Sequence, residues 1–411
     1  MDVEKNLKIS LFEGIISGIH FSIANGVYIT AFATKIGALA HDVAFMSSLF
    51  NISIIFSFLS IILLFFYRRP MMLAGITGFI SRGIWILFLF EKFWNIKILL
   101  IVVFFSGVFL NVSATAWAYW FSNLLKKYEA KRGEYLGVRL GVITFTQTIS
   151  FFIIAIIFEK IGFKALFLTL FLLSLISFIL YLFQDEIPIE GKYDIKNYLK
   201  EAFSDKGFKG FLFYLILFNF LLGITAPMFG YYAVKYMHLT NFELGLWMVS
   251  MGIGSTIFQP FWGKFIDKLS PRTTLKINLF YVSTIPIIWI IRPSWMWYFI
   301  YIDGFFGTIG WAGINLAHSY ITLMLIKNPL YQVLFTSFGG IFGFLGNNLG
   351  GYIVKIFPNE EIGIKFSFFL SFIFRILIGL YLPKFEMKKV MKTKEAIKYI
   401  FKYLLDKIIT R

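Results

Sequence analysis

Three ionisable side chains interrupt long apolar runs of this sequence, and each is a candidate for chemistry. His20 lies deep in the first run, and Asp303 and His318 lie in a run near the C-terminal end. An ionisable group at membrane depth is costly unless it is paired or hydrated, so its presence predicts a function. A carboxyl group or an imidazole that moves between wet and closed surroundings changes its proton affinity. We therefore predict proton coupling through Asp303 and His20, with His318 as the third candidate.

Each of these residues also has a structural alternative. His20 could do no more than hydrogen-bond a neighbouring helix, as polar residues in membrane helices often do. Asp303 could lie hydrated near the outer mouth, and His318 lies deeper toward the cytoplasm. The two interpretations stay open at the level of the sequence.

Amide and aromatic side chains in the same kind of run could line a solute cavity. Indole and phenol rings suit flat or cationic solutes, although packing is the alternative role for them. The further candidates are Asn25, Asn111, Trp117, Tyr119, Trp120, Asn219, Trp311 and Asn315. The chain has no cysteine and no metal-ligand spacing, so we predict neither a metal site nor a cofactor.

The elements that position these side chains are apolar runs long enough to cross a bilayer as helices. The chain has 411 residues, of which 58% are hydrophobic and 53 are Phe. About 20 mainly apolar residues span the hydrocarbon as a helix, and a lone strand cannot satisfy its backbone there. The sequence predicts an all-α integral membrane protein with twelve spans. They are residues 9–35, 41–66, 71–91, 96–125, 136–158, 163–184, 210–236, 242–266, 273–292, 296–326, 331–357 and 362–382.

Charge and polarity divide the chain into two six-helix halves. The longest polar break is 185–209, so we predict an N-terminal bundle (1–184), a cytoplasmic linker and a C-terminal bundle (210–382). Arg and Lys alternate between connections, which predicts a plasma-membrane protein with both termini in the cytoplasm. The net charge of +17 favours anionic lipid head groups over nucleic acid as the partner. The tail 383–411 is predicted to be a basic amphipathic helix on that surface.

A ten-residue motif supports this architecture. Residues 263–272 read Gly-Lys-Phe-Ile-Asp-Lys-Leu-Ser-Pro-Arg, and Arg132-Gly133 is followed by Gly137 after the fourth span. The first motif resembles the loop signature of the major facilitator superfamily, except that Ser270 replaces its second glycine. Residues 259–263 and 310–315 resemble a broad prokaryotic branch of that family, whose substrates are mostly unassigned.

The resemblance implies two pseudo-symmetric bundles that rock about a central cavity. Its lining would come from the first, fourth, seventh and tenth helices, which carry the candidate residues above. It also implies that Asp267 lies near the cytoplasmic start of the eleventh helix. A carboxylate is stabilised at a helix N-terminus, and Lys268 or Arg272 could add a charged contact.

These contacts would form a latch on the cytoplasmic side. The first copy of the signature is degenerate, with Leu64 in place of the acid, and only Arg68-Arg69 survives of it. We therefore predict a one-sided latch, carried mainly by Asp267 and completed by Gly263, Lys268, Arg272, Arg68 and Arg69. An ordinary juxtamembrane charge cluster is the alternative.

Three further charged residues lie within predicted spans but are not among the candidate cavity residues. Glu13 is placed for gating at the cytoplasmic end of the first span. Arg82 and Arg375 lie in helices that the resemblance places at the periphery. We predict structural roles for both, through backbone carbonyls or an acid.

The sequence as a whole predicts a secondary active transporter of a small organic solute. It would be a monomer that works by alternating access, coupled to protons. Export is favoured over import because the candidate cavity offers aromatic and amide groups but few fixed charges. No nucleotide-binding loop and no clustered catalytic constellation are present, which argues against an ATP-driven pump and an enzyme. A membrane enzyme or lipid-handling protein on a similar scaffold, and an importer of sugars or other polar solutes, are the alternatives.

Overall fold

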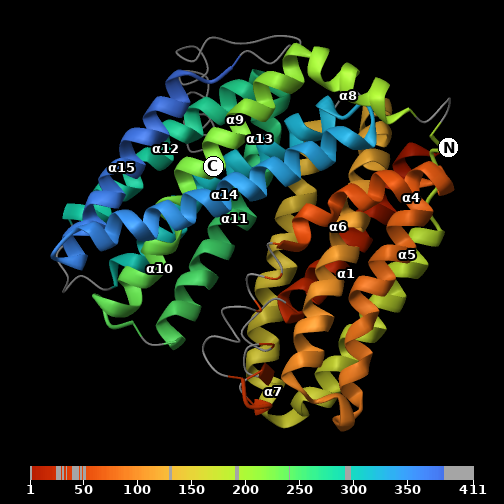
Figure 1. Ribbon diagram of the computed structural model, residues 1–411, viewed down its shortest axis with the longest axis horizontal. Helices are drawn as coiled ribbons and strands as arrows, with labels where there is room; N and C mark the ends of the chain where they lie inside the picture. Colours follow the sequence, from red (N-terminus) through yellow and green to blue (C-terminus); the bar gives the residue numbers. More distant parts are fainter. Residues whose placement is uncertain are drawn as a thin grey trace, which may run out of the picture. The chain divides into compact units, whose positions relative to one another are not determined.

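The computed structural model of the chain describes residues 2–24, 52–128, 132–189, 194–239, 241–291 and 298–383, with a few positions between 29 and 49. Every regular element in these ranges is a helix (Figure 1). The predicted all-α architecture is therefore confirmed. The helices are α1 (Val3–Ala24), η1 (Ile54–Phe58), α4 (Leu59–Tyr67), α5 (Pro70–Gly83), η2 (Ile84–Leu89), η3 (Glu91–Phe93), α6 (Ile96–Lys127), α7 (Arg132–Leu182), α8 (Ile195–Ser204), α9 (Lys206–Gly223), α10 (Ala226–Lys235), α11 (Asn241–Leu269), α12 (Pro271–Ile291), α13 (Phe299–Leu325), α14 (Pro329–Ile356) and α15 (Glu360–Leu380).

Nine segments of the described chain are long and apolar enough to cross a membrane. They correspond to the predicted first, third to seventh, ninth, eleventh and twelfth spans. The eighth and tenth correspond to α11 and α13, which have 29 and 27 residues but are less apolar because of their polar and glycine residues. Of the second span, the shorter apolar segment Ile54–Tyr67 is described. Of the predicted tail 383–411, residues 384–411 lie outside the described residues.

Two helices depart from simple rods. The long α7 contains Gly162 with φ 68° and ψ 179°, so two predicted spans meet there without a long loop. This backbone conformation favours glycine, because a side chain would be strained at that φ. The predicted seventh span is also divided, since α9 ends at Gly223 and α10 begins at Ala226. Between them the Thr225 hydroxyl lies within hydrogen-bond distance of Leu222 O, at 3.3 Å, and of Ser371 Oγ, at 3.0 Å, which satisfies polar groups at the break.

The chain forms two compact units. The first unit comprises Met1–Glu129, Val142–Ala202 and Leu323–Gly340, and the second comprises Ala130–Gly141, Phe203–Thr322 and Ile341–Arg411. Relative to the predicted bundles 1–184 and 210–382, the start of α7 belongs to the second unit and the start of α14 to the first. The predicted domain boundaries themselves stay a prediction.

Serine and aromatic side chains hold the first unit together. In the neighbouring helices α5 and α6, Ser81 and Ser106 each donate a hydroxyl hydrogen to the other's carbonyl, at 2.7 and 2.9 Å. Such interhelical hydrogen bonds join helices where lipid provides no hydrophobic driving force. Phe32 is fully buried, and its ring contacts four aromatic neighbours edge-on or tilted. Part of the large Phe content therefore forms a packed interior.

Candidate functional site

The second unit contains a cavity of about 330 Å³ that combines aromatic walls with two opposite charges. It lies among α9, α10, α11, α12, α13 and α15, so both parts of the divided seventh span contribute to it. The lining residues are Leu222, Ala226, Phe229, Gly230, Trp247, Met251, Ile285, Trp289, Asp303, Gly304, Gly307, Thr308, Trp311 and Arg375. Few polar groups in a mainly apolar concavity are typical of a small-molecule site.

Asp303 provides the negative charge of this cavity. Its side chain is buried, and its Oδ2 accepts a hydrogen bond of 2.8 Å from Trp289 Nε1. Gly304 allows Trp247 to approach, because a Cβ at that position would lie 2.6 Å from Trp247 Cδ1. The indole rings of Trp247 and Trp289 then lie 5.9 Å apart. The carboxylate is thus held beside a group of large aromatic rings.

Arg375 provides the positive charge. It is 3% exposed, and one terminal nitrogen donates to Val282 O at 2.6 Å. Its guanidinium carbon lies 5.3 Å from the Trp311 ring and 5.9 Å from the Phe229 ring. Its Nε has no hydrogen-bond partner in the described part of the chain. The predicted carbonyl contact is confirmed, but sequence reasoning missed the cavity position because it placed the twelfth helix at the periphery.

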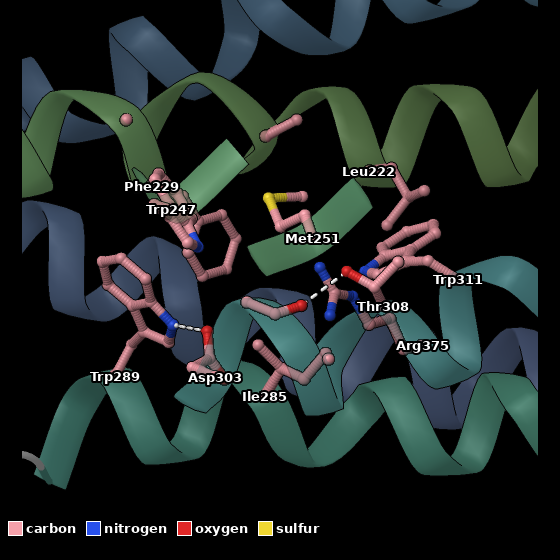
Figure 2. A pocket seen from close by; sticks show the side chains of 14 residues that line it. Leu222, Phe229, Trp247, Met251, Ile285, Trp289, Asp303, Thr308, Trp311 and Arg375 are labelled. Carbon is pink, nitrogen blue, oxygen red and sulfur yellow. Dashed lines mark hydrogen bonds between the residues drawn. The ribbon is translucent and has the colours of Figure 1, made fainter. Parts of the chain in front are cut away.

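The two charges occupy different ends of the cavity. Figure 2 shows Asp303 beside Trp289 on one side and Arg375 beside Trp311 on the other, with Met251 and Ile285 between them. A solute in this cavity would meet an acceptor at one end, a planar donor at the other and apolar side chains between. Of the residues predicted from the sequence, Asp303 and Trp311 are the two that the cavity brings together.

The predicted proton site His20 belongs to a buried polar cluster in the first unit. Glu13 is 3% exposed and accepts hydrogen bonds from Arg82 at 3.1 Å, from Ser177 at 2.9 Å and from Ser17. His20 Nε2 lies 3.3 Å from Arg82 O. The prediction that Arg82 pairs with an acid is confirmed. For His20, the structural alternative of a hydrogen bond to a neighbouring helix has a specific partner, the Arg82 carbonyl. The proton role of His20 stays a prediction.

The remaining candidates of the first unit lie on α6 or near it. Asn111 donates to Ser53 Oγ at 3.1 Å and to Gly107 O at 2.8 Å, and Trp117 stacks on Phe121. Tyr119 accepts, through its backbone carbonyl, the hydroxyl of Ser122 and the amide of Asn123. Asn25 lies outside the described residues. These contacts leave the predicted cavity roles of Asn111, Trp117 and Tyr119 as predictions.

Trp120 has a different environment from the one we expected. It is fully buried, and its indole donates to the carbonyl of Asp185 at 2.9 Å. The Asp185 carboxylate in turn accepts from Asn6 Nδ2 at 2.9 Å, which lowers the pKa of that carboxyl. Trp120 therefore anchors the chain where the sixth span ends. Its predicted contact with a solute has no structural support.

The remaining candidates of the second unit lie on α9 and α13. His318 Nε2 lies 2.7 Å from the hydroxyl of Tyr214, and the Phe218 ring lies 4.8 Å from the imidazole. Asn219 donates to Leu215 O within its own helix, and Asn315 is exposed. His318 is thus within reach of a second titratable side chain, but it does not line the cavity described above.

Asp267 caps the start of a helix, as predicted, but the helix is the fifth span and not the eleventh. Its two carboxylate oxygens accept from Gly133 N at 2.8 Å and from Glu134 N at 2.7 Å, in the first turn of α7. These are amides that the helix itself leaves unpaired. Three glycines allow α7 and α11 to pack closely here: Gly133, Gly137 and Gly263. A Cβ on Gly137, for example, would lie 2.5 Å from Gln259 O. The motif after the fourth span is therefore the docking surface for Asp267.

Of the two basic residues predicted to contact Asp267, Arg272 acts elsewhere. Arg272 donates to Pro383 O and Leu382 O, both at 2.8 Å, so it caps the end of the twelfth span and does not contact Asp267. Arg68 and Arg69 are exposed, and their backbone forms the turn between α4 and α5. Lys268 is exposed. The expected charged contact from Arg272 is wrong, because its guanidinium donates to the carbonyls of Leu382 and Pro383, just beyond the end of α15.

The corresponding position in the first unit lacks a carboxylate. Leu64 is fully buried, and the first amide of α14 that needs a partner, Leu330 N, is bound by Asn328 Oδ1 at 3.1 Å. Lys126 donates to Ile326 O just before that helix, at 2.6 Å. In the described residues, the start of α14 is therefore capped by the local side-chain amide of Asn328.

Comparison with known proteins gives a consistent result. The family model described as Major Facilitator Superfamily matches residues 11–347. No curated protein sequence matches the chain. Among solved structures, a bacterial homologue of the iron transporter ferroportin in its outward-facing state is similar, with a TM-score of 0.67, 14% identity, and coverage of 92% of this chain and 98% of that one. The human organic anion transporter MFSD10 is similar with a TM-score of 0.66, 10% identity, and coverage of 92% and 100%.

Proposed function

This chain belongs to the major facilitator superfamily, and from that premise we propose that it exports a small organic solute across the plasma membrane in exchange for protons. It is a multi-pass membrane transporter and not an enzyme. The observation that carries the proposal is the cavity of the second unit, in which Asp303 lies among aromatic rings. The solute would bind there and be exposed to each side in turn as the two halves rock.

Exchange requires that proton and solute compete for one group. Asp303 can bind either a proton or a positively charged part of the solute. A buried carboxylate that binds neither of them is energetically costly. Each outward delivery of solute would then be followed by uptake of a proton at the same carboxylate. His20 and His318 remain the second and third candidates for proton coupling, at the Arg82 carbonyl and the Tyr214 hydroxyl respectively.

An organic solute suits this site better than a metal ion. One of the similar structures is a homologue of an iron transporter and the other transports organic anions. In the described ranges, no group of three or more His, Asp or Glu side chains is placed to hold a metal ion. The lining by Phe229, Trp247, Trp289 and Trp311 favours an organic body.

We expect Asp303→Asn to abolish accumulation against a gradient, because an amide cannot exchange a proton. The measurement is solute uptake into proteoliposomes with an imposed proton gradient, with His20→Gln and His318→Gln tested singly and combined with it. Glu4→Gln, an exposed acid at the start of α1, is the matched control. If the triple variant still accumulates solute like the parent, the transporter works without protons at these residues.

Asp267 is proposed to stabilise the cytoplasmic closed state. Its bonds to the first amides of α7 can persist only while α7 and α11 remain in contact. The latch would be one-sided, because the start of α14 is capped by its own neighbour Asn328 and not by a carboxylate from another helix.

Both termini are proposed to lie in the cytoplasm. The chain is proposed to act as a monomer, with its basic tail on anionic lipid.

A labelling experiment tests this topology. Lys200 in the linker and Lys355 at the end of α14 are both exposed. We expect a cysteine at Lys355, but not one at Lys200, to react with an impermeant thiol reagent added to intact cells. The natural absence of cysteine makes these the two reactive positions. Equal labelling of both would contradict this topology.

A further inference from the structure

The charges of the cavity in the second unit call for a ligand that carries both signs. We propose that the cavity selects a zwitterion with an amine near Asp303, a carboxylate near Arg375 and a compact apolar body between them. The inference rests on the proposed function, because it names the solute class of that same site. It is drawn from three features: the acidic end, the basic end and the apolar middle.

The acidic end is built to receive an alkylammonium group. Trp289 occupies Oδ2 of Asp303, and the aromatic rings nearby present faces that attract cations. The Trp247 and Trp289 rings lie 5.9 Å apart, and Phe229, whose ring also lies 5.9 Å from the Arg375 guanidinium carbon, meets Trp289 edge to face at 5.1 Å. A carboxylate among aromatic faces is the arrangement that binds ammonium groups well.

The basic end is built to receive a carboxylate. A guanidinium has five donors in a planar fork that matches two carboxylate oxygens. In Arg375 the bond to Val282 O uses one terminal nitrogen, while the Nε is left without a partner at 3% exposure. A buried donor without a partner is costly, so a ligand that supplies an acceptor gains more than an ordinary hydrogen bond. The guanidinium carbon lies over the face of Trp311, 5.3 Å from the ring centroid.

The pair of charges excludes ligands of a single sign. A monoanion held by Arg375 would share the cavity with Asp303, and a monocation held by Asp303 would share it with Arg375. Each case leaves like charges together in surroundings that screen them poorly. A zwitterion satisfies both ends at once, and Met251 and Ile285 contact its apolar middle. The volume of about 330 Å³ limits the ligand to a compact molecule.

The test uses three probes with one carbon skeleton: 6-aminohexanoate, hexylamine and hexanoate. Binding to the purified full-length protein is followed by quenching of tryptophan fluorescence, because Trp247, Trp289 and Trp311 line the cavity. We expect 6-aminohexanoate, or the shorter 4-aminobutyrate, to bind at least about tenfold more tightly than either singly charged probe. Phenylalanine, whose two charges share one carbon, should bind less well than the better ω-amino acid.

Variants assign the two ends. Asp303→Asn should remove the preference for the zwitterion over hexanoate, and Arg375→Gln should remove the preference over hexylamine. Arg375→Lys keeps the charge but not the fork, and should retain part of the selectivity if Arg375→Gln fails to fold. If hexylamine or hexanoate binds the parent protein as tightly as both ω-amino acids, the inference is wrong.

Equilibrium binding separates this inference from the proposed function. Selective binding without transport in proteoliposomes would overturn the transport proposal and leave the ligand class standing. Proton-driven transport of solutes with one charge, without selective zwitterion binding, would overturn the ligand class alone.

Discussion

Arg82→Met is expected to destabilise the protein by about 3–5 kcal/mol, since it leaves a buried carboxylate without its partner. Glu13 is 3% exposed, and its Oε1 lies 3.1 Å from the Arg82 guanidinium. Ser17 and Ser177 also donate to Glu13, but neither hydroxyl neutralises its charge. The loss should appear as a lower unfolding temperature of the detergent-solubilised protein and as poor expression.

The double variant Glu13→Gln with Arg82→Met provides the decisive comparison. It removes both charges, so much of the lost stability should return even though the ion pair is absent. Arg69→Met, at an exposed arginine near the start of α5, is the matched control and should change little. Equal stability of the Arg82 variant and the parent would mean that the Glu13 carboxylate is neutral or solvated in the folded protein.

Gly263→Ala is expected to separate the start of α7 from α11 and to reduce transport strongly. The added Cβ would overlap the carbonyl oxygen of Gly133, a backbone atom that cannot move without the helix. Forcing extra atoms into a packed contact typically costs about 1–3 kcal/mol. The shift would also break the bonds from Gly133 N and Glu134 N to Asp267. Faster hydrogen exchange of these two amides is therefore the direct readout.

Two further variants distinguish backbone contact from charge. Asp267→Asn should speed the exchange of at least one of these amides, because Asn keeps only one acceptor oxygen, and it should cost less stability because it adds no atoms at the contact. Gly245→Ala, on the same helix α11, meets nothing within 4 Å and should be neutral or slightly stabilising. If the Gly263 variant exchanges and transports like the parent, the close approach of α7 and α11 has no role in the transport cycle.

Much of the architecture could be predicted because the bilayer constrains the sequence strongly. Long apolar runs predict helices, and the motif that contains Asp267 predicts a carboxylate at a helix start. The choice of the fifth helix over the eleventh could not be read from the motif alone. It depends on which helix presents free amides and glycines at the correct place, and those are Gly133 and Glu134 with Gly137.

The role of single side chains was harder to predict because their partners are distant in sequence. Trp120 was expected in a cavity but binds the Asp185 carbonyl, 65 residues away. Arg272 was expected beside Asp267 but caps the carbonyls of Leu382 and Pro383. Neither residue type reveals its partner, since an indole donates equally well to a carbonyl or a solute.

By itself the sequence determined the solvent, the helical class and the positions where charge enters the membrane. It could do so because the cost of unpaired backbone and charge in hydrocarbon acts on each segment locally. Only the tertiary structure decided that Asp303 and Arg375 share one cavity while His20 and Glu13 join a separate buried cluster. That outcome depends on how several helices pack around each group, through close approaches such as that of Gly304 to Trp247, and no local pattern encodes it.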